Sequence, residues 1–325
     1  MCFFQIEDSR VFLCSRGGRC GEMCKYHDQA LLPTGAFRAR GIIAAMQISV
    51  ILSTYNSPRW LEKVLWGYQH QQLRDFEIVI ADDGSDARTR ELIERMRVET
   101  GLRIKHVWQQ DKGFRKCRIV NKAILEAAHD YLVFSDGDCI PRRDFLQVHA
   151  DEARPGHFLS GSYFKLPMAT SEAITQADIS SGDCFRLDWL RQHGLRSWRK
   201  TTKLRAGPRM AQWLNRLTTT RCNLKGSNAS AWKQDVLAIN GLDERMPWGG
   251  EDREFGVRLR NLGIRPRHVR FNAIVIHLDH ARGYVDPAQV KANRQLWQHN
   301  KRHGVHWTDN GIRQLQEAAA TADSQ

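Results

Sequence analysis

Short apolar runs alternate with amphipathic segments between residues 46 and 141. The runs are rich in β-branched residues and too short for helices, whereas the segments between them carry apolar residues three and four positions apart, as at Leu61, Leu65 and Tyr68. The predicted strands are Ile48–Thr54, Glu77–Ala81, Arg103–Trp108 and Tyr131–Ser135, and the predicted helices begin after Pro58, after Ser85 and at Cys117. This order predicts an α/β fold with a Rossmann-like, mainly parallel sheet flanked by helices, whose ligand crevice lies at the carboxyl ends of the strands.

The alternation loosens after Pro141, which predicts a smaller mixed region on the carboxyl side. The elements expected there are helices at Ala229–Asn240 and Arg253–Leu262, a strand at Asn272–Ile276, and a final amphipathic helix capped by Asp286 with Val290 and Leu296 inside. The tail beyond Gln314 is expected to fray.

Four segments follow from these patterns. Residues 1–45 lack periodicity, and a clear strand begins directly after Met46, so we expect this stretch to be a non-native extension of the natural protein. Residues 46–150 are expected to form the ligand-binding half of one domain, 151–283 the other half of the same domain, and 284–325 a helix and tail.

Acidic residues follow the second and fourth predicted strands, at Asp82-Asp83 and at Asp136-Gly137-Asp138. The carboxyl ends of neighbouring parallel strands meet at one edge of a sheet, so these side chains are expected to converge with Ser53 at the end of the first strand. Two carboxylates separated by glycine suit Mn²⁺ or Mg²⁺ holding a diphosphate; the alternative is an ordinary acidic turn. No glycine-rich phosphate loop follows the first strand, which argues against dinucleotide dehydrogenases and P-loop enzymes.

A second group of polar residues follows Trp248-Gly249-Gly250. Glu251 and Asp252 are expected at a helix N-terminus, where the helix dipole favours their ionised forms, and the flexible glycine turn suits a loop that closes over a substrate. Simple charge complementarity at a helix end is the alternative. Two histidines, His277 and His280, follow the last predicted strand, and either is a candidate to complete a metal site with Asp138.

Charge adds a further expectation. The chain carries a net charge of +13, and eleven lysines and arginines against one acid lie between Arg186 and Lys225. Such a surface suits an anionic partner: a phosphorylated glycolipid, membrane headgroups or nucleic acid. A solvated surface without a partner is the alternative. No apolar run approaches the roughly 20 residues of a membrane span, and the eight irregularly spaced cysteines fit a reducing compartment.

Taken together, these motifs resemble those of the inverting family 2 glycosyltransferases of the GT-A fold, over Ile48–Gly283. Ser53-Thr54-Tyr55-Asn56, the Asp82 group and the Asp136 group occur in that family's order, and Gly226–Asp252 resembles a segment shared with galactosyltransferases.

The resemblance implies a role for each matching residue. Tyr55 would stack on the nucleotide base, Asp83 would hydrogen-bond the base with Asp82 beside it, and Asp136 would face the ribose. Ser53 is also expected among the donor-binding residues. Arg118 would lie near the base or diphosphate, although the family's usual Ala-Arg-Asn is Arg118-Ile119-Val120-Asn121 here. Asp138 and His277 would bind the metal. Asp252 would be the general base, with Glu251 and Trp248 shaping the sugar sites.

The implied activity is metal-dependent transfer of a hexose or N-acetylhexosamine from a UDP sugar to a bacterial surface glycan, such as lipopolysaccharide core or capsule. Expected partners are the nucleotide sugar, an anionic glycolipid or glycan acceptor, and the cytoplasmic face of the inner membrane, with no nucleic acid. A sugar-nucleotide pyrophosphorylase shares the sheet architecture but would show a glycine-rich, arginine-containing loop after the first strand. A basic polysaccharide- or nucleic-acid-binding protein with a degenerate site is the non-enzymatic alternative.

Overall fold

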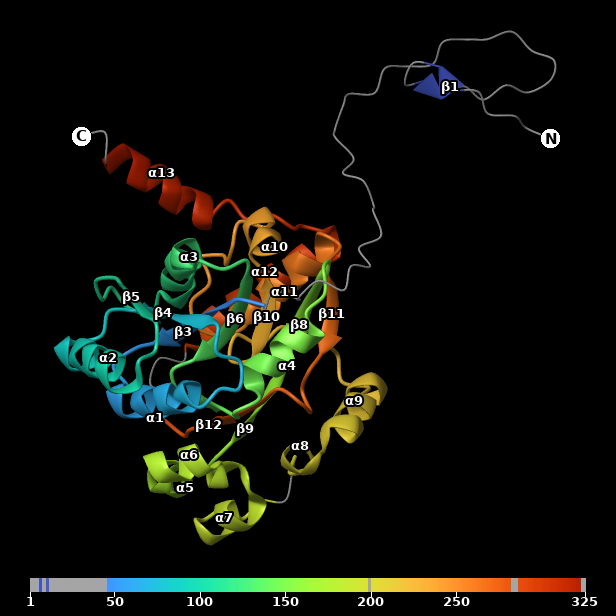
Figure 1. Cartoon of the computed structure of the whole chain (residues 1–325). Coiled ribbons are helices and arrows are strands. Elements are labelled where there is room, and N and C mark those ends of the chain that lie inside the picture. Colours follow the sequence, from blue (N-terminus) through green and yellow to red (C-terminus); the bar gives the residue numbers. More distant parts are fainter. Residues whose placement is uncertain (1–5, 8–9, 12–45, 198–199, 282–285, 323–325) are drawn as a thin grey trace, which may run out of the picture. The chain divides into compact units, whose positions relative to one another are not determined.

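The computed structural model describes residues 6–7, 10–11, 46–197, 200–281 and 286–322 (Figure 1). Most of the predicted extension at residues 1–45 therefore lies outside the described residues. Its two described pieces, β1 (Ile6–Glu7) and β2 (Arg10–Val11), form an antiparallel pair.

A seven-stranded sheet forms the centre of the fold (Figure 1). Its order is β11 (Arg265–His268), β8 (His157–Ser160), β10 (Ala229–Trp232), β6 (Tyr131–Asp136), β3 (Ile48–Thr54), β4 (Phe76–Asp82) and β5 (Ile104–Trp108). Only β10 runs antiparallel to its neighbours β6 and β8, so the sheet is mixed but mostly parallel. The predicted α/β fold with a mainly parallel sheet is confirmed.

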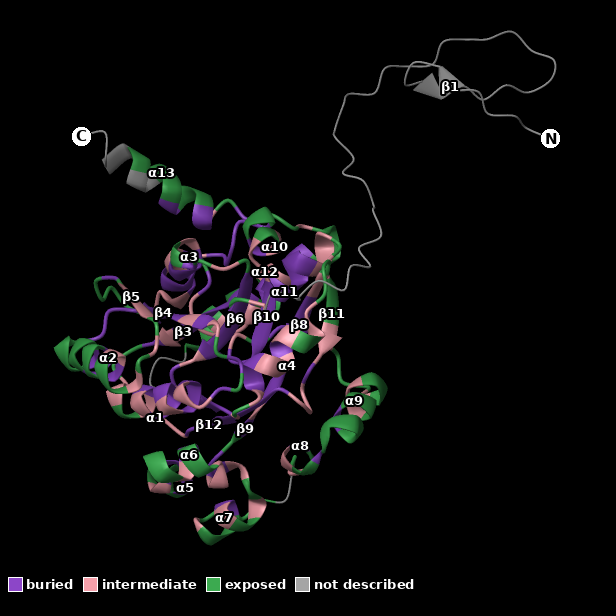
Figure 2. Cartoon of the chain, in the orientation of Figure 1, coloured by how far each residue is buried: buried purple, intermediate pink, exposed green. Residues whose placement is uncertain are grey.

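Helices cover both faces of this sheet, which explains the continuous apolar runs of its strands. Side chains alternate between the faces: Val50 and Leu52 of β3 belong to one buried cluster and Ile51 to the other. Helices α1 (Pro58–Gln69) and α2 (Ala87–Thr100) pack in the first cluster, and α3 (Lys116–Glu126), α10 (Lys233–Ala238) and α11 (Glu251–Asn261) in the second. Figure 2 shows that the strands of the sheet are mostly buried, whereas the helices around them carry more exposed residues.

A second, three-stranded sheet brings two distant parts of the chain together. Its order is β7 (Cys139–Pro141), β12 (Ile274–His277) and β9 (Ser162–Lys165). In the antiparallel pair of β12 and β7, His277 lies opposite Cys139. The backbone N–H of Leu278 also donates to the carbonyl of Asp138 at 2.9 Å. This pairing places the end of β12 against the turn that follows β6.

Short helices fill the region between residues 145 and 217. They are α4 (Phe145–Glu152), α5 (Met168–Ala173), α6 (Gln176–Ser181), the 3₁₀ turn η1 (Asp183–Phe185), α7 (Leu187–Gln192), α8 (Thr202–Arg205) and α9 (Pro208–Leu217). None of the helices in the described parts of the chain is both long and apolar enough to cross a membrane.

Two expectations for the carboxyl half were wrong, and a third was confirmed. Ala229–Trp232, predicted as helix, is strand β10, because its buried alanines pair with β6 and the sheet overrides the helical preference of alanine. The predicted final helix, α12 (Pro287–His303), is confirmed with Asp286 as its N-cap, and Leu296 packs against the second cluster as predicted, although the most buried residues are Asn293 and Asn300. A further helix, α13 (Ile312–Ala322), occupies the tail expected to fray, since Ile312 packs in the second cluster.

Candidate active site

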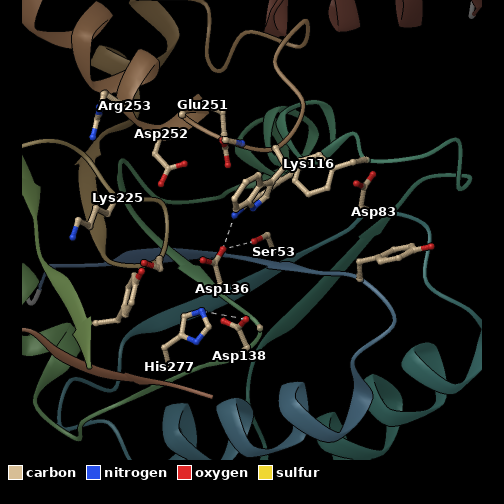
Figure 3. A pocket seen from close by; sticks show the side chains of 18 of the residues that line it. Ser53, Asp83, Lys116, Asp136, Asp138, Lys225, Glu251, Asp252, Arg253 and His277 are labelled. Atoms are coloured by element: carbon tan, nitrogen blue, oxygen red, sulfur yellow. Dashed lines mark hydrogen bonds and ion pairs between the residues drawn. The ribbon is translucent and has the colours of Figure 1, made fainter. Parts of the chain in front are cut away.

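A cavity of about 1490 Å³ opens at the carboxyl ends of β3, β4 and β6, as the strand order predicted (Figure 3). The loop at residues 220–225, the start of α11 and one face of α12 line it from other sides. Nine predicted site residues line the cavity: Ser53, Tyr55, Asp83, Asp136, Asp138, Trp248, Glu251, Asp252 and His277. Asp82 and Arg118 are absent from its lining. The sequence-distant carboxylates at 136–138 and 251–252 therefore share one space.

Asp138 lies beside two histidines supplied by the end of β12. Its Oδ2 is 3.6 Å from Nε2 of His277 and 3.0 Å from Nε2 of His280. Burial alone would raise the pKa of Asp138, but the hydrogen bond from His280 and the charges of both histidines outweigh it and lower that pKa. Asp138, Cys139 and His277 also present ligand atoms within 4.8 Å of one another. This set of donors fits one divalent cation.

Asp136, the last residue of β6, lines the cavity. Its Oδ1 accepts hydrogen bonds from Oγ of Ser53 at 2.7 Å and from Nζ of Lys116 at 2.6 Å (Figure 3). Burial opposes the charge of Lys116, but the charges of Asp136, Asp252 and Glu251 outweigh it and raise the lysine's pKa. Lys116 is thus a cation shared by the carboxylates of both groups.

Sequence reasoning missed Lys116. The one local signal is its place as the first residue of α3, where a cation opposes the helix dipole. Arg118, predicted near the base or diphosphate, instead pairs with Glu244 at 2.7 Å outside the lining of the cavity. Its predicted role is not tested by this contact.

The wall formed by β3 and β4 holds the remaining donor-side residues. The carboxylate of Asp83 accepts from Nε2 of Gln109 and from the backbone N–H of Arg115, each at 2.7 Å, and burial raises its pKa. Tyr55 is 48% exposed, so its ring face is accessible, and its hydroxyl donates to Asp111 at 2.9 Å.

Asp82 has a different environment from its neighbour. It is 1% exposed, and its carboxylate accepts from the backbone N–H of Ser85 and lies 2.9 Å from Nε2 of His106. These contacts hold the turn that presents Asp83 to the cavity.

Glu251 and Asp252 lie in the first turn of α11, as predicted, and point into the cavity from the side opposite β3 (Figure 3). Asp252 accepts from the backbone N–H of Gly226 at 2.9 Å and Glu251 from that of Gly249 at 2.8 Å. The prediction that the dipole keeps both ionised was wrong for Glu251: burial and the charge of Asp252 raise its pKa to about 8. Glu251 therefore carries a proton at neutral pH.

Helix α12 holds the loop before α11 in place. Gly249 and Gly250 have φ of 109° and 101°, a conformation that favours glycine. Nδ2 of Asn293 on α12 donates to the carbonyls of Pro247 and Gly249 at 3.0 and 3.1 Å. A Cβ at Gly249 would lie 2.8 Å from Cγ2 of Val290. The predicted flexible turn is therefore held against α12.

Cations dominate the side of the cavity around α11 and the 220–225 loop. Arg221, Lys225, Arg253 and Arg294 line it, and all four are exposed. Within the described residues, none of the four makes an ion pair with a carboxylate. Aromatic rings accompany two of them, Trp297 beside Arg253 and Tyr163 beside Lys225. This wall presents uncompensated positive charge to whatever enters the cavity.

Comparison with known proteins decides the family. Residues 49–203 match the model of glycosyl transferase family 2, and residues 217–281 match that of the N-terminal domain of galactosyltransferase. The chain contains a glycosyltransferase family 2 domain with a galactosyltransferase-like C-terminal segment. The two matches together include every residue of the candidate site described above except Arg294, Trp297 and the α12 residues around them.

Curated relatives are similar to this chain over about two thirds of its length. Chondroitin synthase of Pasteurella multocida is 26% identical over 65% of the chain and 23% of its own length. Validoxylamine A glucosyltransferase of Streptomyces hygroscopicus is 28% identical over 67% of the chain and 52% of its own length. The chain thus spans between about a quarter and a half of these relatives.

Solved structures confirm the fold. TarS 1–349 of Staphylococcus aureus, in complex with UDP-GlcNAc, matches with a TM-score of 0.54 at 15% identity, over 80% of this chain and 69% of that one. A mannosyltransferase of Pyrobaculum calidifontis, in complex with GDP-Man and Mn²⁺, matches with a TM-score of 0.50 at 17% identity, over 74% and 59%. The GT-A fold implied by the sequence motifs is therefore correct.

Proposed function

We propose that this chain transfers a hexose or N-acetylhexosamine, with inversion, from a UDP-linked donor to an anionic bacterial surface glycan such as lipopolysaccharide core or capsule. The observation that carries the proposal is the convergence of two carboxylate groups on one cavity, Asp136 and Asp138 on one side and Glu251 and Asp252 on the other. Relatives named as sugar transferases and synthases, and a matched structure with UDP-GlcNAc, support a nucleotide sugar as donor.

The donor would lie along the ends of β3, β4 and β6. The exposed ring of Tyr55 suits stacking on a nucleobase, and Asp83 offers carboxylate acceptors to base N–H groups. Asp136 is placed by Ser53 and Lys116, and suits a ribose hydroxyl. We assign to Lys116 the cationic role near the diphosphate, because it lines the cavity and Arg118 does not.

Asp138, His277 and His280 fit a resident divalent cation. Their mixed carboxylate and imidazole donors suit Mn²⁺ better than Mg²⁺, which prefers oxygen ligands. A cation bound there would offset the negative charge that develops on the departing diphosphate. The remaining chemistry belongs to the chain's own residues.

Asp252 is the proposed general base. Inversion requires one group that removes the proton from the acceptor hydroxyl while that oxygen attacks the anomeric carbon from the face opposite the diphosphate. Glu251 is protonated at neutral pH and donates or orients, whereas Asp252, placed by the N–H of Gly226, is free to accept the proton.

The acceptor is proposed to be anionic because the wall it must contact carries Arg221, Lys225, Arg253 and Arg294. Arginine binds phosphate and carboxylate groups through paired N–H donors, and tryptophan rings such as Trp297 suit the apolar faces of sugars. Buried free cysteines at positions 117, 139 and 184 fit a reducing compartment such as the cytoplasm.

The test is release of UDP or GDP from a panel of nucleotide sugars with Mn²⁺, Mg²⁺ or EDTA, since transferases slowly hydrolyse their donor without an acceptor. We expect metal-dependent UDP release from one donor, reduced about 10⁴-fold in Asp138→Ala because the leaving group loses its counter-charge. Asp151→Ala, which removes an exposed carboxylate on α4, is the control and should retain full activity. Metal-dependent release at the same rate in Asp138→Ala would disprove the assigned site. Failure to bind UDP with Mn²⁺ in calorimetry would instead favour a binding protein with a degenerate site.

A further inference from the structure

Helix α9 presents an apolar stripe to solvent. Nine large hydrophobic side chains are exposed among the described residues, and three of them, Met210, Trp213 and Leu217, lie on this ten-residue helix. They are 44%, 61% and 57% exposed. At about 100° per residue, the three fall within an arc of about 60°, so they form a continuous face and not scattered surface residues. Figure 2 shows α9 largely exposed at the margin of the fold.

The opposite face of α9 fixes its orientation. Ala211 is buried, and Asn215 donates from Nδ2 to Oδ1 of Asn272 at 2.8 Å while its own Oδ1 accepts from the backbone N–H of Phe271 at 3.2 Å. Because the inner face is bonded to the loop after β11, the apolar stripe cannot turn inward without breaking these contacts. The stripe is thus held outward.

Positive charge borders this stripe. Arg209 and Arg216 lie on one flank of the helix, about 40–60° from Trp213, and Arg205 and Arg221 lie just before and after it. All four arginines are exposed, and residues 205–221 contain no acidic side chain, which gives this segment a charge of +4. Within the described residues, none of the four makes an ion pair with a carboxylate.

We propose that α9 docks the protein on an anionic lipid bilayer. Met210, Trp213 and Leu217 enter the boundary between headgroups and acyl chains, with the helix axis in the plane of the surface. Arg209 and Arg216 bind lipid phosphates at the level of the headgroups. An exposed apolar face with a tryptophan, bordered by arginines, is the composition of helices that lie in a membrane interface.

Charge argues against two other occupants of this face. A second copy of the chain, paired symmetrically through α9, would bring the arginines of both copies together, and like charges across an interface disfavour it. A nucleic acid would use the arginines, but the aliphatic side chains of Met210 and Leu217 add nothing to its recognition. A bilayer uses both the charge and the apolar stripe.

The position of α9 relative to the cavity suggests that docking brings the cavity to an acceptor in the bilayer. This inference rests on the proposed function. The chain leaves α9 at Leu217 and forms the cavity wall from Thr220 to Lys225. This connection is fixed, because Thr220 accepts at its carbonyl from His268 and Asn223 accepts from Ser160. A lipid-linked anionic acceptor in the same bilayer would therefore meet Arg221 at the mouth of the cavity.

Sedimentation of the full chain with two kinds of vesicle tests the docking without any measurement of turnover. The vesicles are phosphatidylcholine alone and phosphatidylcholine with 30 mol% phosphatidylglycerol. We expect binding to the anionic vesicles that weakens with added salt, and little to the neutral ones. Met210→Gln/Trp213→Gln/Leu217→Gln should bind at least tenfold more weakly. Arg209→Glu/Arg216→Glu should lose at least about 25-fold, because each arginine removed costs roughly fivefold and each new glutamate is also repelled by the anionic surface.

Matched controls exclude general effects of charge and hydrophobicity. Val98→Gln/Trp307→Gln removes exposed apolar side chains elsewhere, and Arg90→Glu/Arg302→Glu makes the same charge change away from α9; both should bind as wild type. Circular dichroism and UDP affinity establish that each variant is folded with an intact cavity. Equal binding by wild type and the α9 variants would overturn the proposal. So would a dimer that the α9 variants dissociate, or single-stranded RNA that binds α9 more tightly than the anionic vesicles.

Discussion

Two pairs of neighbouring carboxyl groups lie on the two walls of the cavity, and the walls neutralise them differently. On the wall formed by β3, β4 and β6, Asp136 and Asp138 have cationic or imidazole partners within 3.0 Å, Lys116 for the first and His280 for the second. On the α11 wall, Glu251 and Asp252 are bound by backbone N–H groups, and burial forces a proton onto Glu251. The first arrangement suits binding of a charged donor, and the second suits proton transfer.

The positive charge of the second wall is arranged for a different purpose. Arg221, Lys225, Arg253 and Arg294 surround the carboxyl groups but make no ion pair with them. Placement, and not net charge, thus decides what each wall does: a cation in direct contact tunes a carboxylate, whereas an exposed cation without a partner remains available to a ligand.

Among variants that test this difference between the walls, Asp252→Asn is expected to have the largest effect on activity. Removing the base should lower sugar transfer and donor hydrolysis about 10³-fold and leave UDP affinity unchanged. The measurement is product release together with calorimetric titration of UDP and Mn²⁺. Asp309→Asn, which alters an exposed carboxylate away from the cavity, is the control. A large loss of UDP affinity in Asp252→Asn would show that the two walls are not separate in function.

Lys116→Met tests the wall formed by β3, β4 and β6, where cationic or imidazole groups contact the carboxylates directly. Without this cation Asp136 would repel the donor diphosphate, and loss of a hydrogen bond between charged groups corresponds to about 10- to 100-fold weaker UDP binding. Arg118→Met, two residues along α3 and paired with Glu244, should bind UDP within twofold of wild type. Equal losses in both variants would support the role that the sequence motifs implied for Arg118.

Gly249→Ala tests whether the loop before α11 must keep its conformation. The positive φ and the close approach to Val290 should lower the free energy of unfolding by about 1–3 kcal/mol and displace Glu251, whose carboxylate accepts from the Gly249 N–H. Gly304→Ala has φ of 66° but open space around its Cβ, so it reports the backbone strain alone. The readouts are thermal unfolding and donor hydrolysis, and equal values for the two variants would remove the loop from the site.

A final prediction concerns the pH dependence of stability. The pKa of Glu251 rises from 4.5 to about 8 on folding, so the wild type should lose stability as the pH rises through this window, where the unfolded chain ionises Glu251 and the folded chain does not. Glu251→Gln removes that loss. Its melting temperature relative to wild type should be unchanged below pH 4.5 and higher above pH 8. Exposed Glu91→Gln is the control, and a difference independent of pH would contradict the protonated state assigned to Glu251.

Sequence patterns predicted the first half of the fold well, because each strand and helix there is set by local periodicity. The four predicted strands match β3 to β6 with small shifts, and Leu61, Leu65 and Tyr68 are buried in α1. The alanine-rich start of residues 229–240 was wrongly predicted as helix. Its strand structure depends on pairing with β6, about 95 residues earlier, and no local sequence pattern indicates that pairing.

The site was predicted where the residues follow strand ends, and missed where it depends on contacts between distant segments. Asp136, Asp138 and Asp252 all line the cavity, as strand order and motif spacing indicated. Lys116 was missed since its partner Asp136 is 20 residues away on another element. The protonation of Glu251 was misjudged because a sequence shows the helix end but not the depth of burial, which here outweighs the helix dipole.

The bond between Asn293 and the loop before α11 has a consequence for protein engineering. Helix α12 lies beyond residue 281, where the second family match ends, yet it holds Pro247 and Gly249 and supplies Arg294 and Trp297 to the cavity. A module excised at the family boundary, or a chimera joined there, would lose one wall of the candidate active site. Domain exchange in this protein should therefore place the junction after His303, at the end of α12.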